Sequence, residues 1–279
     1  KERNLSQEMR DWIVSTSGYF TTTEMYNGLQ LTTRQDQRTS VALISRFIEE
    51  GLVQKYGDKN GVYRHINRET VPMHWKNAAA KEIVVEFPLD IADLVKIYPK
   101  NIIVVAGNAD AGKTAFFLDF IKKNQDDHKI HYFNSEMGED ELRIRLSKHE
   151  DMELEDWKFN AYERSSNFQD VIGPDDINII DFLEVTEDFY RVGSEINQIF
   201  RKLNKGIALI GLQKKRGCDV GRGGDFTLEK PRLYLSMENG YIKVIKAKNW
   251  RTTRNPNGLH RLFKVVQGAI FIPTSPWEE

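Results

Sequence analysis

The sequence predicts an α/β protein whose mostly parallel central sheet is covered by helices on both faces. The first observation is a set of continuous apolar runs, as expected of parallel strands that are buried on both faces. They lie at residues 102–106, 130–133, 177–180 and 207–211. The second is a set of helical segments between the runs, near residues 112–124, 138–148 and 187–204. Such alternation implies right-handed crossovers and a doubly wound sheet.

The remaining segments complete the predicted organisation. Residues 1–68 contain three short amphipathic helical stretches and then two alternating strands around a glycine-containing turn, so we expect a small separate domain there. Residues 69–98 are expected to be a linker and lead-in, with a short helix from Asp90 to Val95. The main domain is expected over residues 99–279, and its last part has the pattern of successive strands. These lie near residues 232–237, 241–247, 260–266 and 269–272.

The bulk properties favour a cytoplasmic protein that does not enter a membrane. In the 279 residues no apolar run approaches the roughly 20 residues needed to cross a bilayer, and the N-terminus does not show a basic and apolar leader. Cys218 is the single cysteine and has no internal disulfide partner, which fits a reducing compartment. The net charge is −1, but residues 205–279 carry 14 basic and 6 acidic side chains. That part either meets phosphate groups or is a solvated surface balanced by the acidic middle of the chain.

A glycine-rich segment carries the most specific motif. Residues 107–114 match G-x-x-x-x-G-K-[ST] at every fixed position, directly after a buried run and before a helical stretch. Glycines let successive backbone N–H groups point inward, and the helix N-terminus adds positive potential where phosphates rest. Lys113 would reach the β and γ phosphates, and the Thr114 hydroxyl would hold Mg²⁺. The predicted nucleotide-binding residues are Gly107, Asn108, Ala109, Asp110, Ala111, Gly112, Lys113, Thr114 and Ala115.

Polar residues at the ends of three other predicted strands are candidates for hydrolysis. Asp181 follows the run at residues 177–180, where a carboxylate can orient the water shell of Mg²⁺. Glu136 lies just beyond residues 130–134 and could polarise the attacking water as a general base. Gln213 ends the run that starts at Ile207, where an amide could sense the γ phosphate. For each of the three, the alternative is a purely structural residue at a strand end.

The order of these motifs resembles the ATPase domain of DnaB-type replicative helicases, within the RecA-like P-loop ATPases. The resemblance rests on residues 106–117, 133–137, 180–183 and 212–213, with Glu141-Leu142 and Arg145-Leu146. It implies a RecA-like fold that binds and hydrolyses ATP with Mg²⁺. It also implies that Glu136 activates water, that Asp181 supports Mg²⁺ and that Gln213 couples hydrolysis to a DNA-binding loop. Glu184 is the competing general base if the family assignment is wrong.

The same resemblance implies a homo-oligomer, ring or filament, with the active site at the subunit boundary. Lys248-Asn249-Trp250-Arg251 is similar to a basic pair that reaches the γ phosphate of a neighbouring subunit, so Lys248 and Arg251 are the candidates. A simple surface charge is the alternative. The loop at residues 214–225 matches a loop that contacts single-stranded DNA in that family, and its glycines suggest mobility. Its candidate DNA contacts are Lys214, Lys215, Arg216 and Arg222.

The predicted N-terminal domain resembles the winged helix-turn-helix family. The resemblance covers residues 5–68 and rests on the order of three helices and a hairpin, which implies that the third helix reads duplex DNA. Many such domains instead bind proteins, which is the alternative. The residues that the resemblance places at the reading helix are Arg34, Gln35, Arg38, Thr39 and Ser40. Those on the wing are Lys55, Lys59 and Arg64.

Two functions from different classes fit these motifs. The first is an ATP-hydrolysing motor or assembly factor that acts on DNA in replication or recombination, with a plasmid, phage or other mobile element as one setting. The second is a nucleotide-switched adaptor or regulator whose winged helix binds DNA or a protein, with little ATP turnover. DnaB-type helicases carry a helical N-terminal domain and a linker helix that the sequence does not contain. This difference argues against processive unwinding by a hexamer.

Overall fold

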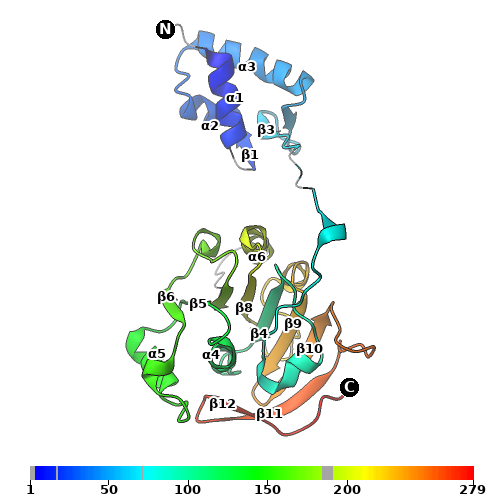
Figure 1. Ribbon diagram of the computed structural model, residues 1–279. Coiled ribbons are helices and arrows are strands. Elements are labelled where there is room, and N and C mark those ends of the chain that lie inside the picture. The colour runs from blue at the N-terminus through cyan, green and yellow to red at the C-terminus, as the bar shows by residue number, and fades with distance from the viewer. Residues whose placement is uncertain (1–3, 17, 69, 71, 184–190) are drawn as a thin grey trace. The chain divides into compact units, whose positions relative to one another are not determined.

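The protein consists of two compact units, Lys1–Ala78 and Ala79–Glu279. The computed structural model describes residues 4–16, 18–68, 70, 72–183 and 191–279 (Figure 1). The boundary between the units falls inside the expected linker and lead-in, residues 69–98. Residues 79–98 therefore belong to the larger unit.

The smaller unit contains three helices and a three-stranded antiparallel sheet. The helices are α1 (Leu5–Ser15), α2 (Thr22–Gly28) and α3 (Arg34–Glu49). The strands are β1 (Tyr19–Thr21), β2 (Val53–Lys55) and β3 (Val62–His65), in the order β1-β3-β2. The helices and the β2–β3 hairpin agree with the sequence prediction, whereas the three-residue strand β1 was not predicted.

Local sequence explains how these helices begin and pack. The Thr21 hydroxyl accepts a hydrogen bond from the Glu24 backbone N–H, and the Glu24 carboxylate accepts one from the Thr21 N–H, a reciprocal cap that starts α2. The helices pack around a core of Met9, Ile13, Phe20, Met25, Ile44, Phe47 and Val53. Val41, which the sequence placed on the apolar stripe of α3, is instead 54% exposed.

The larger unit is built on one nine-stranded sheet with the order β12-β11-β10-β9-β4-β8-β7-β5-β6. Its parallel part contains β4 (Ile102–Gly107), β5 (Ile130–Asn134), β6 (Asn160–Glu163), β7 (Ile177–Asp181), β8 (Ile207–Gln213) and β9 (Leu233–Glu238). An antiparallel extension contains β10 (Tyr241–Ala247), β11 (His260–Val266) and β12 (Ile270–Pro273). The mostly parallel α/β architecture confirms the predicted fold class.

Helices cover both faces of this sheet, because the strand side chains alternate between two apolar layers. On β4, Ile103 and Val105 pack with helix α4 (Lys113–Asn124), whereas Val104 packs with helix α6 (Arg191–Lys202) on the other face. Helix α5 (Glu139–Leu146) follows β5. Because all the parallel strands end at one edge, the residues that follow β4, β5, β7 and β8 gather there.

Residues 79–98 form a strap on the larger unit. Val85, Phe87, Ile91 and Val95 are buried in the same apolar layer as α4. The predicted helix from Asp90 to Val95 is wrong: the chain forms a 3-10 segment, Pro88–Asp93, in which Leu89 and Asp90 have φ values of +62° and +57°. These left-handed values exclude an α-helix. Tertiary contacts fix this conformation, since the Leu89 carbonyl accepts hydrogen bonds from Arg261 and Trp277 at 2.8 and 3.0 Å.

Candidate nucleotide-binding site

The predicted phosphate loop lies between β4 and α4, as the motif requires. Gly112 has a φ of +91°, a conformation that residues with a side chain adopt only at a cost. At Gly107 a Cβ atom would lie 3.0 Å from the Lys113 side chain, so glycine lets this side chain cross the loop. No side chain among the described residues caps the N-terminus of α4. Its first backbone N–H groups and its positive dipole therefore face the loop, where they can bind an anion.

Lys113 lies at the centre of the loop. Its ammonium group donates hydrogen bonds to the carbonyl oxygens of Gly107 and Asn108, both at 3.2 Å. Burial lowers the pKa of Lys113, and the negative charges of Asp181, Glu136 and Asp110 oppose this change. The three carboxylates thus favour the charged form of an ammonium that is largely removed from water.

Asp181 ends β7 and is 2% exposed. The Tyr132 hydroxyl donates a hydrogen bond to its Oδ2 atom at 2.7 Å. Burial raises the pKa of Asp181, and the Tyr132 hydroxyl, the nearby Thr114 hydroxyl and the Lys113 charge oppose that rise. Burial beside Asp181 also raises the pKa of Tyr132 well above its ordinary value, so the tyrosine stays a donor.

The second carboxylate oxygen is the observation that bears on Mg²⁺. Asp181 Oδ1 is buried and has no hydrogen-bond partner among the residues that the structure describes. Such an orphaned oxygen close to the Thr114 hydroxyl fits an ion that binds one or two protein oxygens and completes its shell with phosphate and water. Groups of three or more His, Cys, Asp or Glu that could hold a metal alone are absent from the described part of the chain. The donor set therefore fits Mg²⁺ bound together with a nucleotide.

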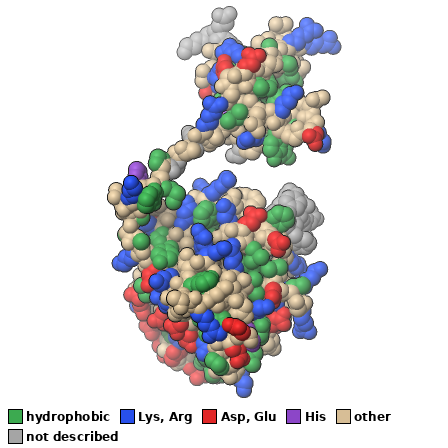
Figure 2. Space-filling model, turned by 90° about the vertical axis from the view of Figure 1, so that its right-hand side faces the viewer, with side chains coloured by type: hydrophobic (Ala, Val, Ile, Leu, Met, Phe, Trp, Pro, Cys, Tyr) green, Lys and Arg blue, Asp and Glu red, His purple; other side chains and the backbone are tan. Residues whose placement is uncertain are grey.

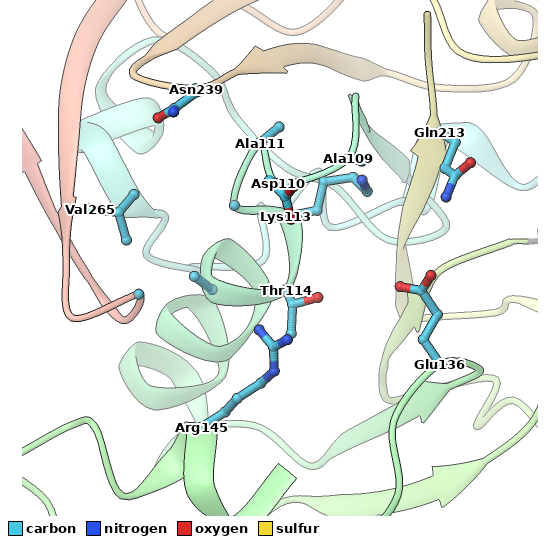
Figure 3. Close-up of a pocket in the computed structure, with 13 residues that line it drawn as sticks. Ala109, Asp110, Ala111, Lys113, Thr114, Glu136, Arg145, Gln213, Asn239 and Val265 are labelled. Carbon is cyan, nitrogen blue, oxygen red and sulfur yellow. The ribbon is translucent and has the colours of Figure 1, made fainter. Parts of the chain in front are cut away.

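The phosphate loop forms one wall of a pocket of about 370 Å³, within the range of sites for small molecules. Figure 3 shows the Glu136 carboxylate and the Gln213 amide facing each other at one end, with the Thr114 hydroxyl directed toward them. Glu136 comes from the segment after β5, and Gln213 is the last residue of β8. The fold thus brings together three groups that the sequence proposed for phosphate, metal and water.

Several pocket residues were not predicted. Asn239 and Val265 lie at the end opposite Glu136, and Gly268 also lines the pocket (Figure 3). They come from the β9–β10 turn and the β11–β12 hairpin, which the sequence indicated only as turns and strands. Arg145 on α5 directs its guanidinium group toward Thr114 in Figure 3 and binds Glu141 at 2.8 Å. The sequence included Arg145 in the helicase resemblance but assigned it no role.

The predicted trans-acting pair lies outside this pocket. Lys248 directly follows β10 and is exposed. Arg251 forms an ion pair with Glu82 at 3.1 Å and donates a hydrogen bond from Nε to the Ala92 carbonyl at 2.6 Å. Both contacts tie the strap to the core. The alternative general base, Glu184, lies outside the described residues.

The loop at residues 214–225 is anchored at several points. Lys214 is 1% exposed at its side chain and pairs with Glu238 at 2.6 Å. The Gly221 N–H donates a hydrogen bond to the Tyr234 hydroxyl at 2.8 Å, and Asp219 pairs with Lys243 at 2.8 Å. Contrary to the sequence prediction, Lys214 is not available as a DNA contact, because its charge is buried and paired. The other three predicted contacts, Lys215, Arg216 and Arg222, are exposed.

In the smaller unit, the residues proposed to read duplex DNA are mostly accessible. The exposed residues are Arg34, Gln35, Arg38, Thr39, Lys55 and Lys59. Ser40 is the exception: it is buried, and its hydroxyl donates a hydrogen bond to the Gln37 carbonyl at 2.8 Å, so it is not a DNA contact. Arg34 and Arg38 are one helical turn apart and line the same surface hollow with Tyr26 and Val41. Arg64 is partly buried.

The surface charge does not form one large basic patch on the face shown in Figure 2. Acidic side chains gather on the lower left of the larger unit there, and Lys and Arg side chains are spread over the same face. None of the helices in the described ranges has the length and apolar character needed to span a bilayer. Contact with nucleic acid would therefore depend on local groups such as the loop arginines.

Comparison with solved structures bears on the fold. The KaiC-like protein PH0186 from Pyrococcus horikoshii OT3 is similar over 69% of this chain and 99% of its own, with a TM-score of 0.52 and 14% identity. The larger unit has a RecA-like P-loop ATPase fold. The solved ATPase domain of a second protein is also similar, over 64% of this chain and 86% of its own, with a TM-score of 0.47 and 17% identity. No family model and no curated protein sequence matches the chain. At these identities the RecA-like likeness concerns the fold alone.

Proposed function

We propose that this chain binds ATP with Mg²⁺ and hydrolyses it. The observation that carries the proposal is the meeting, at one edge of the sheet, of the phosphate loop, the orphaned Asp181 oxygen and Glu136. Lys113 and the N-terminus of α4 would stabilise charge on the phosphates, and Thr114 and Asp181 would hold the ion. Glu136 would take a proton from the attacking water as general base.

We further propose that Gln213 and Arg145 act on the same phosphates. Gln213 is the last residue of β8, and its amide faces Glu136 in Figure 3. It is also hydrogen-bonded through its backbone carbonyl to the Arg222 N–H at 2.7 Å. A change at the γ phosphate would thereby reach the loop at residues 214–225. Arg145 would add positive charge next to Thr114.

A homo-oligomer with shared active sites is the proposed assembly. Of the two candidate cations, Lys248 is favoured to reach a neighbouring γ phosphate, because the Arg251 guanidinium already binds Glu82 and Ala92 within its own chain. Supply of a cation from a second copy would make hydrolysis depend on assembly. Measuring the mass in solution with and without ATP, alongside phosphate release from the same samples, tests assembly and chemistry together.

Single-stranded DNA is the proposed partner of the anchored loop. Lys215, Arg216 and Arg222 are exposed, and the anchors at Lys214 and Gly221 would hold them in place. Fixed cations with little sequence preference suit binding to a phosphate backbone. The proposed motor or assembly factor would use this contact in DNA replication or recombination.

Replacing Lys215, Arg216 and Arg222 together with alanine is expected to weaken binding of an oligothymidine by about tenfold or more at about 0.1 M salt, because each lost phosphate contact also reduces counterion release. The salt dependence of binding, measured by fluorescence anisotropy, should become shallower. A control in which Lys123, Lys202 and Lys205 are replaced removes the same charge from exposed positions elsewhere. Equal weakening by both triple variants would show that only net charge matters, against a site at the loop.

Duplex DNA is the proposed partner of the smaller unit, through Arg34, Gln35 and Arg38 on α3. The double replacement of Arg34 and Arg38 with alanine is expected to weaken binding to duplex DNA by about tenfold, since each arginine contact contributes about 1 kcal/mol or more. The control replaces Arg46 and Lys59, which are also exposed but lie at the end of α3 and in the β2–β3 turn. If only the control weakens binding, α3 does not contact DNA.

The adaptor function makes a different prediction for the same protein. ATP turnover that rises when single-stranded DNA is added favours the motor or assembly factor. Binding of ATP with negligible turnover, unchanged by DNA, favours the nucleotide-switched adaptor. A phosphate-release assay with and without DNA distinguishes the two directly.

A further inference from the structure

Tyr132 and Asp181 form a buried pair beneath the phosphate loop. The tyrosine is 0% exposed, and its hydroxyl donates to Asp181 Oδ2 at 2.7 Å. The tyrosine ring packs edge-on against Phe159, with centroids 5.9 Å apart, so the ring is held in place as well as the hydroxyl. The bond joins residues 49 positions apart, so only the tertiary fold creates it.

The strand register explains how the hydroxyl reaches the carboxylate. Tyr132 on β5 lies opposite Ile179 on the parallel strand β7. Asp181 is two residues farther along β7, and hence on the same face of the sheet. Two residues of a strand span about 6.6 Å, which matches the length of a tyrosine side chain from Cα to hydroxyl. A shorter side chain at residue 132 would not reach Asp181.

The two oxygens of Asp181 are thereby distinguished. Oδ2 accepts the Tyr132 hydroxyl, whereas Oδ1 is buried without a partner among the described residues. A carboxylate with one oxygen fixed cannot rotate freely about its terminal bond, so the orientation of the other oxygen is also fixed. Outer groups that orient a metal-binding carboxylate in this way affect ion affinity without touching the ion.

We propose that Tyr132 is a positioning residue that orients Asp181, so that Oδ1 faces the Mg²⁺ that binds with the nucleotide. This inference rests on the proposed function, since it concerns the ion of that same site. Thr114 and Asp181 would hold the ion, and Tyr132 would act only through Asp181. The competing explanation is that the hydroxyl merely satisfies a buried carboxylate and stabilises the fold.

Tyr132→Phe removes the hydroxyl and keeps the ring that packs on Phe159. ADP binding is followed by calorimetry while Mg²⁺ is varied, and again with the ion removed by a chelator. The variant should need about tenfold more Mg²⁺ for half-maximal enhancement of ADP binding. ADP binding without Mg²⁺ should stay as in the unaltered protein, because the phosphate loop is intact.

Tyr234→Phe is the matched control. Tyr234 is also fully buried, and its hydroxyl accepts from Gly221 and contacts Thr227 at 3.0 Å, on the opposite face of the sheet. Its loss should leave the Mg²⁺ requirement unchanged. An unchanged requirement in Tyr132→Phe as well, with only a lower unfolding temperature, would overturn the positioning role.

A double-mutant cycle tests whether Tyr132 acts through Asp181. In an Asp181→Asn background, Tyr132→Phe should cause no further rise in the Mg²⁺ requirement, since the oriented carboxylate is already gone. A further rise of the same size would show an independent effect and contradict the inference. If the unaltered protein binds ADP equally with and without Mg²⁺, the proposed metal site itself fails, which is a different result from failure of the Tyr132 role alone.

Discussion

Replacement of Lys113 with alanine is expected to lower the rate of ATP hydrolysis by about 10²–10³-fold, the usual effect of removing one preorganised group that stabilises transition-state charge. The reason is geometric: the ammonium lies at the centre of the phosphate loop, bound to the Gly107 and Asn108 carbonyls at 3.2 Å. ATP binding should weaken too, because the lysine contacts the phosphates in the ground state as well. Phosphate release at saturating ATP and equilibrium binding measure the two effects separately.

Lys123→Ala is the control for that experiment. Lys123 is an exposed lysine near the C-terminal end of the same helix, α4, whereas the phosphate loop precedes its N-terminal end. Its loss removes the same charge and should leave turnover within about twofold of the unaltered protein, since exposed charges at such distances are screened. A Lys113→Ala protein that turns over ATP as fast as Lys123→Ala would contradict the assignment of the phosphate site.

Glu136→Gln is expected to reduce turnover by about 10²–10⁴-fold, because an amide cannot accept the proton of the attacking water. ATP affinity should be retained or increased, as the substitution removes a negative charge near the phosphates and keeps the shape of the side chain. Single-turnover hydrolysis measured beside nucleotide binding separates these effects. Loss of turnover without loss of binding is the pattern of a general base.

Glu139→Gln provides the comparison, since Glu139 is exposed in the first turn of α5, close to Glu136 in sequence. It should hydrolyse ATP at nearly the normal rate. If Glu136→Gln also hydrolyses ATP normally, the general base lies elsewhere, and Glu184 is then the next residue to replace.

The sequence predicted the parts of the fold that depend on local pattern. Residues 102–106 are apolar throughout because β4 is buried on both faces, and the phosphate loop is recognisable by glycines whose φ values and close contacts other residues could not provide. The strand ends that carry Asp181 and Gln213 followed from the same runs. Parallel connectivity then made their convergence predictable.

Features that depend on distant partners were missed. Strand β6 is exposed along its whole length, so it has no apolar run to mark it. The charge of Lys214 was interpreted as available to DNA, because its partner Glu238 lies 24 residues away. The same reason hid the pocket wall at Asn239 and Val265, and the Tyr132 hydroxyl that binds Asp181. No local pattern predicts such contacts.

Titration of the unaltered protein with ADP in the presence of Mg²⁺, followed by calorimetry, tests the central claim most directly. A phosphate loop with N–H groups, an ammonium and a helix N-terminus aimed at one point should bind one nucleotide per chain, and Lys113→Ala should weaken that binding. Absence of measurable heat at millimolar ADP and ATP, under conditions in which the protein is folded, would contradict the account.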